Sequence, residues 1–132
     1  MEDEVMGVVR AYFEAGVTKD ARALREIHLD DPRFSSFGDL PPYGLKDYES
    51  AMLLEELRFA SISDYSYRIR DPKVAVFGGT AVAAFGLLQS GMLVDNKAFT
   101  GRQVSMEGRA TFVLAMSGGW KIVHKHISSA QH

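Results

Sequence analysis

The first part of the chain carries apolar residues at helical spacing. Over residues 2–17 they recur every three or four positions behind an acidic first turn, which predicts an amphipathic helix with its acids where the helix dipole favours them. Asp20 is suited to cap a short second helix over residues 21–28. The acidic segment and proline at 30–32 should end that helix, and residues 33–37 are predicted to form a short strand.

A loop rich in proline and glycine over residues 38–44 precedes a third helix, predicted over residues 45–60. Its apolar residues form one broad face, which requires a flat surface to pack on. From Ser63 the pattern becomes that of strands joined by tight turns, expected over residues 64–70, 73–77, 80–92, 100–116 and 121–128. Helices followed by a long antiparallel meander are typical of an α+β fold, in which three N-terminal helices pack on one face of a strongly curved, mainly antiparallel sheet.

Two of the expected strands are apolar on both of their alternating faces. They are the segments 81–88 and 111–116, so the sheet has no face that is well suited to water. Because three helices can cover only one side of the sheet, a second subunit is the simplest cover for the other. We therefore expect a homodimer that packs through the outer sheet face.

Composition restricts the class of protein further. A chain of 132 residues with 46% hydrophobic content predicts one domain over residues 1–132. Fifteen basic and seventeen acidic residues give a net charge of −2 without a basic stripe, so nucleic acid is not an expected partner. The chain has no cysteine, an acidic N-terminus and no apolar run of membrane-spanning length. These features predict a cytoplasmic protein that does not enter a membrane.

The element order, together with the closing sequence Gly-Trp-Lys-Ile-Val-His-Lys-His-Ile-Ser over residues 119–128, resembles the SnoaL-like branch of the nuclear transport factor 2-like superfamily. The resemblance covers nearly the whole chain. It implies a cone-shaped α+β fold with a pocket between the bent sheet and the helices, usually in a dimer. The superfamily includes isomerases, dehydratases, cyclases and epoxide hydrolases as well as pockets without known chemistry, so the resemblance predicts fold better than function.

The closing strand carries the main candidate site. Strict alternation places Trp120, Ile122, His124 and His126 on one side of it. Trp120 would then pack at the closed end of a pocket, and the two histidines would act as a general base or a polar recognition pair near its mouth. Alternatively, one histidine packs against Trp120 and the other hydrogen-bonds a neighbouring strand. A zinc site is not expected, because zinc needs three or four ligands.

Arg109 and Tyr12 complete the candidate pocket. Arg109 shares a strand face with Glu107, so it either binds an acidic group of a ligand or forms a solvated pair with that glutamate. Tyr12 resembles the helix-1 oxyanion donor of ketosteroid isomerases, but the aspartate base of those enzymes corresponds here to Ser36 or a neighbour. Because serine cannot replace that base unaided, Tyr12 is either a pocket acid or a core tyrosine.

We therefore predict a small-molecule-binding pocket protein that uses no cofactor, with Tyr12, Arg109, Trp120, His124 and His126 as candidate ligand-binding residues. The alternative is a cofactor-independent isomerase, lyase or hydrolase acting on a small, partly apolar metabolite, carboxylated or not. Neither the ligand nor a catalytic residue follows from the sequence, because it contains no complete acid–base constellation.

Overall fold

The computed structural model describes residues 1–95 and 97–129. The predicted domain over residues 1–132 thus includes position 96 and positions 130–132, which lie outside the described residues. The elements follow in the order α1 (Glu2–Thr18), α2 (Ala21–Glu26), β1 (Ser35–Phe37), α3 (Tyr48–Ala60), β2 (Ile62–Phe77), β3 (Thr80–Asp95), β4 (Thr100–Met116) and β5 (Trp120–Ser129).

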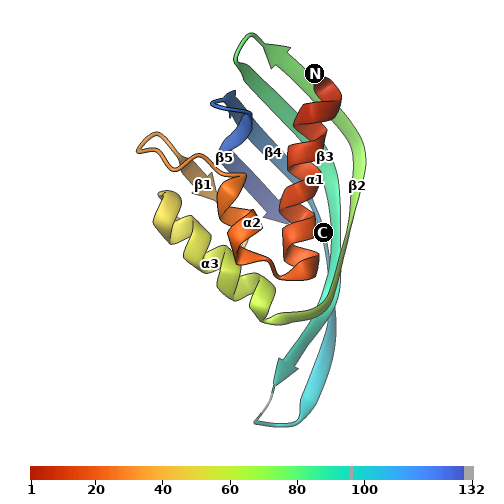
Figure 1. The fold of residues 1–132 in the computed structure, drawn as a ribbon. Coiled ribbons are helices and arrows are strands. Elements are labelled where there is room, and N and C mark those ends of the chain that lie inside the picture. Colours follow the sequence, from red (N-terminus) through yellow and green to blue (C-terminus); the bar gives the residue numbers. More distant parts are fainter. Residues whose placement is uncertain (96, 130–132) are drawn as a thin grey trace.

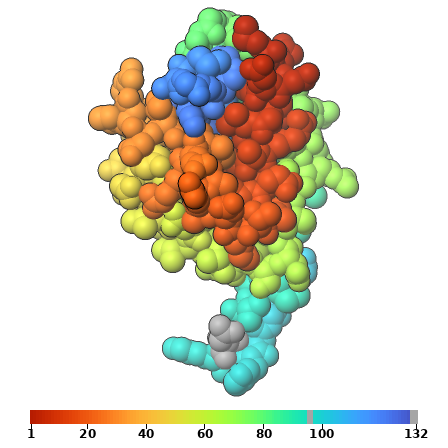
Figure 2. Space-filling view, viewed as in Figure 1, coloured from red at the N-terminus to blue at the C-terminus, as the bar shows by residue number. Residues whose placement is uncertain are grey.

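The strands form one sheet in the order β1-β5-β4-β3-β2. β1 runs parallel to β5, and the other neighbouring pairs are antiparallel. Figure 1 shows the three helices together on one side of the bent sheet, and the far end of the β3–β4 hairpin projects beyond this body in Figure 2. The predicted α+β fold with three helices on a mainly antiparallel sheet is confirmed.

Helix α1 packs its aromatic residues against the middle of the sheet. The ring centroids of Tyr12 and Phe112 are 5.4 Å apart, and those of Phe13 and Phe112 are 6.0 Å apart. Gly16 lets α1 approach α3 closely, since a Cβ atom at this position would lie 2.4 Å from the Phe59 ring. The core therefore fixes α1 and α3 relative to each other, and with them Tyr12 and Glu55, whose side chains are hydrogen-bonded.

The start of helix α2 has a local cause and its end a tertiary one. The Asp20 side chain accepts a hydrogen bond from the Ala23 amide, so the predicted cap is present. The helix ends at Glu26, earlier than predicted, because the chain then pairs with Ile122 of β5 through the Ile27 carbonyl and the Leu29 amide.

Helix α3 begins at Tyr48 rather than at residue 45, with Asp47 as its capping residue. The Asp47 carboxylate accepts from the Ser50 amide at 2.9 Å. No helix within the described ranges combines the length and apolarity needed to cross a membrane.

Strand β2 is continuous where two strands were predicted. Its register against β3 shifts between Arg70 and Lys73, and Asp71 has a positive φ of 49°. A proline has no amide to donate to the ladder and is tolerated at a bulge. Asp71 and Pro72 therefore form a bulge inside one strand, instead of the predicted turn between two.

The outer sheet face is partly apolar. Val82 and Val113 pair across β3 and β4 and are half-buried. Arg109 and Thr111, which share that face of β4, are exposed. The outer face is therefore poorly suited to water only at the end of the sheet that carries Val82 and Val113, and not over its whole length as expected.

Candidate functional site

A β-bulge in β5 decides which side chains of the closing strand point inward. Leu114 of β4 lies opposite Ile122, but the preceding residue, Val113, lies opposite His124. Val123 is therefore an extra residue in β5. Such a bulge reverses the alternation of side chains beyond it, because the period of a strand is two residues.

The consequence is that Lys125 and Ile127 follow Trp120 on the inner face. They are 1% and 4% exposed, whereas His126 is exposed and His124 is half-buried. The prediction that His124 and His126 share the inner face with Trp120 is wrong, because strict alternation cannot be extended through the bulge.

The two histidines lie near β1 instead. Nδ1 of His124 is 2.8 Å from the Ser35 hydroxyl oxygen, and the ring of His126 lies 5.5 Å from that of Phe37. Partial burial, with a smaller effect of His126, lowers the pKa of His124. His124 is therefore biased towards its neutral form, and burial is the main cause.

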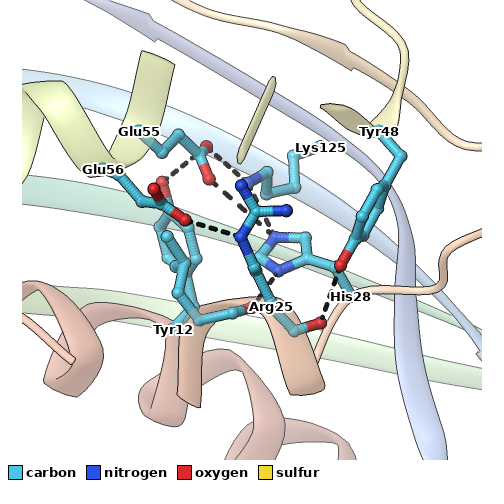
Figure 3. Close-up of polar contacts among 8 residues, drawn as sticks. Tyr12, Arg25, His28, Tyr48, Glu55, Glu56 and Lys125 are labelled. Atoms are coloured by element: carbon cyan, nitrogen blue, oxygen red, sulfur yellow. Dashed lines mark hydrogen bonds and ion pairs between the residues drawn. The ribbon is translucent and has the colours of Figure 1, made fainter. Parts of the chain in front are cut away.

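Lys125 is the centre of a polar network inside the core. Its ammonium donates hydrogen bonds to Oε1 of Glu55 and, at 2.8 Å, to Nε2 of His28. It also lies 4.3 Å from the centroid of the Tyr12 ring. The Tyr12 hydroxyl donates to the same Glu55 oxygen at 2.8 Å. Figure 3 shows these side chains pointing towards one another from α1, from the residues just after α2, from α3 and from β5.

Burial controls the protonation of the network. Nδ1 of His28 donates to the Leu24 carbonyl at 2.6 Å, so Nε2 is free to accept from Lys125. Desolvation and then the charge of Lys125 lower the pKa of His28 well below its usual value. Desolvation also lowers the pKa of Lys125, against the opposing effect of Glu55. Desolvation, followed by the charge of Glu55, raises the pKa of Tyr12 well above its usual value. His28 and Tyr12 are thus both neutral at pH 7.

A cavity of about 300 Å³ adjoins this network between α3, the segment 36–41 and β5. Most of its walls are apolar, and the charged side chains among them are Asp39, Lys46, Glu55, Arg58 and Lys125. The apolar part is formed by Phe37, Leu40, Pro41, Ala51, Leu54, Leu57, Ile62, Leu93 and Ile127. The cavity therefore has a polar region beside the Lys125 network and an apolar remainder.

Several polar atoms of the cavity wall are buried without a hydrogen-bond partner in the described part of the chain. They are Oδ1 of Asp39, Oε2 of Glu55, and Nε and Nη2 of Arg58. Nη1 of Arg58 lies 3.5 Å from Oδ1 of Asp39, while Oδ2 of Asp39 accepts from the Ser129 hydroxyl at 3.0 Å. Unpaired buried polar atoms are rare in native proteins and each is unfavourable, so this wall is suited to polar groups that the chain does not itself supply.

The remaining predicted site residues lie outside the cavity wall. Tyr12 reaches it only through Glu55. Trp120 is buried on the inner face without lining the cavity. Arg109 is exposed on the outer face, and Glu107 lies 3.7 Å from Arg70 rather than pairing with Arg109. Ligand binding by any of these residues stays a prediction.

The charged residues that line the cavity are not among the residues predicted from the sequence. Glu55 could have been found, because it lies three positions after Met52 and four before Phe59, both buried in α3. His28 lies on the apolar side of the predicted second helix, which is also a signal. Lys125 gave none, since its burial depends on the bulge at Val123. Among the described residues no three histidine, aspartate or glutamate side chains are grouped as metal ligands.

The fold and site together define an α+β pocket domain, in which helices on one face of a bent sheet enclose a cavity with a buried polar wall. The family model of the SnoaL-like domain matches residues 5–131. The chain therefore belongs to the SnoaL-like domain family, as its closing sequence predicted. No curated protein sequence matches it significantly.

Solved structures of the nuclear transport factor 2-like (NTF2-like) superfamily share the fold. A superfamily protein from Salmonella enterica serovar Typhimurium is similar with a TM-score of 0.84 and 21% identity, covering 99% of this chain and 92% of its own. A candidate dehydratase of the NTF2-like family from Streptomyces avermitilis gives a TM-score of 0.83 and 18% identity, with 99% and 96% coverage. A candidate aromatic ring hydroxylase from Novosphingobium aromaticivorans gives 0.79 and 20%, with 99% and 90% coverage.

Proposed function

We propose that this chain binds a small, partly apolar molecule in the cavity between α3, the segment 36–41 and β5. The observation that carries this proposal is that one wall combines apolar side chains with buried polar atoms that have no hydrogen-bond partner in the described part of the chain. Ligand sites typically have this composition, because apolar contact supplies most of the affinity and a few polar groups fix the orientation. The volume of about 300 Å³ corresponds to roughly ten water molecules in the liquid, which sets the size of the ligand.

The polar and apolar parts of the cavity lining would orient a ligand. Asp39, Glu55 and Arg58 provide its polar atoms, whereas Leu54 and Leu93 belong to the apolar lining. A ligand with one polar end and an apolar body would pair the polar atoms and remove the apolar surface from water, both of which favour binding. A uniformly polar ligand would leave the apolar lining without a matching surface.

Native mass spectrometry after incubation with a metabolite extract tests this proposal. The wild-type chain should retain a small molecule. Ala51 is 1% exposed and lines the cavity, so Ala51→Leu should fill part of the space and abolish retention. Ala21→Leu adds the same bulk at an exposed position of α2 and should leave retention unchanged. Equal retention by both variants, with the fold intact by circular dichroism, would place the ligand elsewhere.

A second function, catalysis without a cofactor, is favoured by the position of Glu55. One of its carboxylate oxygens accepts from Tyr12 and Lys125, while the other has no hydrogen bond in the described chain. A carboxylate held in this way in a cavity wall is suited to act as a general base. The candidate dehydratase from Streptomyces avermitilis has the same fold, which makes loss of water one reaction to assay. Wild-type protein should then change the mass of a retained metabolite, and Glu55→Gln should retain it unchanged.

We also infer that the chain forms a homodimer through the apolar end of its outer sheet face. Val82 and Val113 lie side by side there and are half-buried in the single chain. Analytical ultracentrifugation should give twice the mass of the 14.6 kDa chain. Val113→Asp should reduce the mass to that of one chain, because an aspartate cannot be buried unpaired at the interface. Arg68→Asp, an exposed position on β2, is the control and should leave the dimer intact.

A further inference from the structure

We propose that the ligand of this cavity carries a carboxylate, and that this carboxylate replaces the carboxylate of Asp39 at the guanidinium of Arg58. The inference rests on the proposed function, since it identifies the chemical group that the cavity recognises. It assigns anion recognition to Arg58 of α3, which lines the cavity, and not to Arg109, which is exposed on the outer sheet face.

The Arg58 side chain is only 14% exposed, and its guanidinium is incompletely paired. Nε and Nη2 have no hydrogen-bond partner within the described residues. These two atoms form one edge of the planar guanidinium, and that edge matches the two oxygens of a carboxylate. Nη1 is 3.5 Å from Oδ1 of Asp39, beyond the usual length of about 2.7–3.2 Å for such a bond. The charge of Arg58 is thus neutralised by Asp39 without being hydrogen-bonded by it.

Asp39 is placed so that it can be exchanged. It lies in the segment 36–41 between β1 and α3, which lines the cavity. Its Oδ1 has no hydrogen-bond partner among residues 1–95 and 97–129, and Oδ2 accepts from the Ser129 hydroxyl. Moving Asp39 away from Arg58 would therefore break an ion pair but no hydrogen bond between the two side chains. Binding of a ligand carboxylate requires this movement to uncover the guanidinium edge as well, since Nε and Nη2 are enclosed by the present walls.

The balance of charge explains why the incoming group replaces Asp39 instead of joining it. In the polar wall two acids, Asp39 and Glu55, face two bases, Arg58 and Lys125. Lys125 is already bonded to Glu55, and the remaining base of the lining, Lys46, is half-buried and donates to the Gly44 carbonyl. A ligand carboxylate that joined Asp39 would put two buried acids on the one guanidinium of Arg58, which is unfavourable. Exchange of one carboxylate for the other keeps the Arg58 pair neutral and completes the bonds of Arg58.

Isothermal titration calorimetry with two matched probes tests the proposal. Octanoate and octanamide have the same number of non-hydrogen atoms and the same alkyl body, but only octanoate carries a charged carboxylate at pH 7. We expect octanoate to bind the wild-type chain at least about tenfold more tightly, because hydrogen bonds to charged groups are stronger than neutral ones.

Three variants separate Arg58 from the rest of the wall. Arg58→Lys keeps the charge but removes the two-atom edge, so it should weaken octanoate about tenfold and leave octanamide unchanged. Asp39→Asn removes the competing carboxylate, so it should tighten octanoate without affecting octanamide. Arg109→Lys makes the same chemical change as Arg58→Lys on the outer face, and it should alter neither affinity. Thermal unfolding monitored by circular dichroism establishes that each variant is folded.

Each result has a definite meaning. Equal binding of octanamide and octanoate would overturn the carboxylate proposal while leaving the small-molecule pocket in place. Weaker octanoate binding by Asp39→Asn would overturn the exchange, because it would show that Asp39 assists the ligand. If neither probe binds and no metabolite is retained, the pocket itself is disproved and the carboxylate proposal with it. If Arg58→Lys does not fold, the two probes on the wild-type chain and on Asp39→Asn still decide the question.

Discussion

Lys125 donates a hydrogen bond to His28 across 2.8 Å, although the two residues are 97 positions apart in the chain and both are buried. The bond requires an unprotonated Nε2, which the bond from Nδ1 of His28 to the Leu24 carbonyl supports. A protonated His28 would place two positive charges next to each other in the core. The folded state therefore selects one protonation state of this imidazole.

This selection should make the stability of the fold depend on pH. The pKa of His28 is lowered well below 6.5 in the folded chain and is about 6.5 when unfolded. Only the unfolded state gains a proton as pH falls below 6.5. The free energy of unfolding should therefore have its full value above that pH and decrease below it. Between pH 7.5 and 5.5 the loss due to His28 should be on the order of 1 kcal/mol. Urea unfolding at both values measures it.

His28→Gln is the variant that isolates this effect, because its amide oxygen can still accept from Lys125 and does not titrate. It should lose most of the pH dependence in this range. His126→Gln replaces an exposed histidine and should keep the full dependence. If His28→Gln kept the wild-type dependence of stability on pH, protonation of His28 would not be its cause. The network of Tyr12, Glu55 and Lys125 would then accommodate the charge of a protonated His28.

The bulge at Val123 predicts opposite accessibility for two adjacent positions of β5. His126 is exposed and Ile127 is 4% exposed. Because the chain contains no cysteine, single cysteines can be introduced without background reaction. His126→Cys should react rapidly with a thiol reagent in the folded protein, and Ile127→Cys should react only at the rate of unfolding. The opposite order would restore the strict alternation that the sequence alone predicts.

The fold was predictable because each element carries a local signal that the tertiary structure does not override. The cap at Asp20 and the apolar spacing of α1 are properties of a few neighbouring residues. So is the change to strands after Ser61. Some boundaries moved because tertiary pairing intervened, as where Ile122 pairs with the chain after Glu26.

The site was less predictable, because it depends on register. Because of the single extra residue at Val123, Lys125 lies on the inner face, where strict alternation would have placed His126. No local propensity distinguishes a bulged strand from a regular one. Glu55 differs from Lys125 in this respect, since helical spacing alone places it on the buried stripe of α3. Tyr12 was predicted as either a pocket acid or a core tyrosine, and its hydroxyl bond to Glu55 links these two alternatives.

The contact between α1 and α3 gives a prediction with a built-in control. A Cβ atom at Gly16 would lie 2.4 Å from the Phe59 ring, whereas one at Gly7 in the same helix would have no heavy atom within 4 Å. Gly16→Ala should therefore destabilise the chain by about 1–3 kcal/mol through overpacking. Gly7→Ala should stabilise it by up to about 1 kcal/mol, because glycine is unfavourable inside a helix. Urea unfolding of both variants measures the difference, and equal effects would show that Phe59 can move aside.

The pairing of Glu55 with Lys125 should be visible as an energetic coupling. Both side chains are nearly buried, at 14% and 1% exposure. Lys125→Met leaves the Glu55 carboxylate with only the Tyr12 hydroxyl as donor, and Glu55→Gln leaves the buried ammonium without a counter-charge. Removing one partner of a buried pair typically costs about 3–5 kcal/mol. The double variant buries no unpaired charge, so its loss should be at least 1 kcal/mol smaller than the sum of the two single losses, within the range of about 0.5–3 kcal/mol measured for residues in contact.

The exposed pair of Arg22 and Glu26 provides a control double-mutant cycle. Their side chains lie one helical turn apart, joined at 3.1 Å, but are 90% and 63% exposed. Arg22→Met and Glu26→Gln make the same chemical changes in water, where the attraction is screened and the charges stay solvated. This second cycle should show no coupling beyond the error of urea unfolding at pH 7. If the Glu55 and Lys125 variants were equally additive, the ammonium in the core would be stabilised by His28 and the Tyr12 ring without a contribution from Glu55, and Glu55 would be free to exchange partners with a ligand.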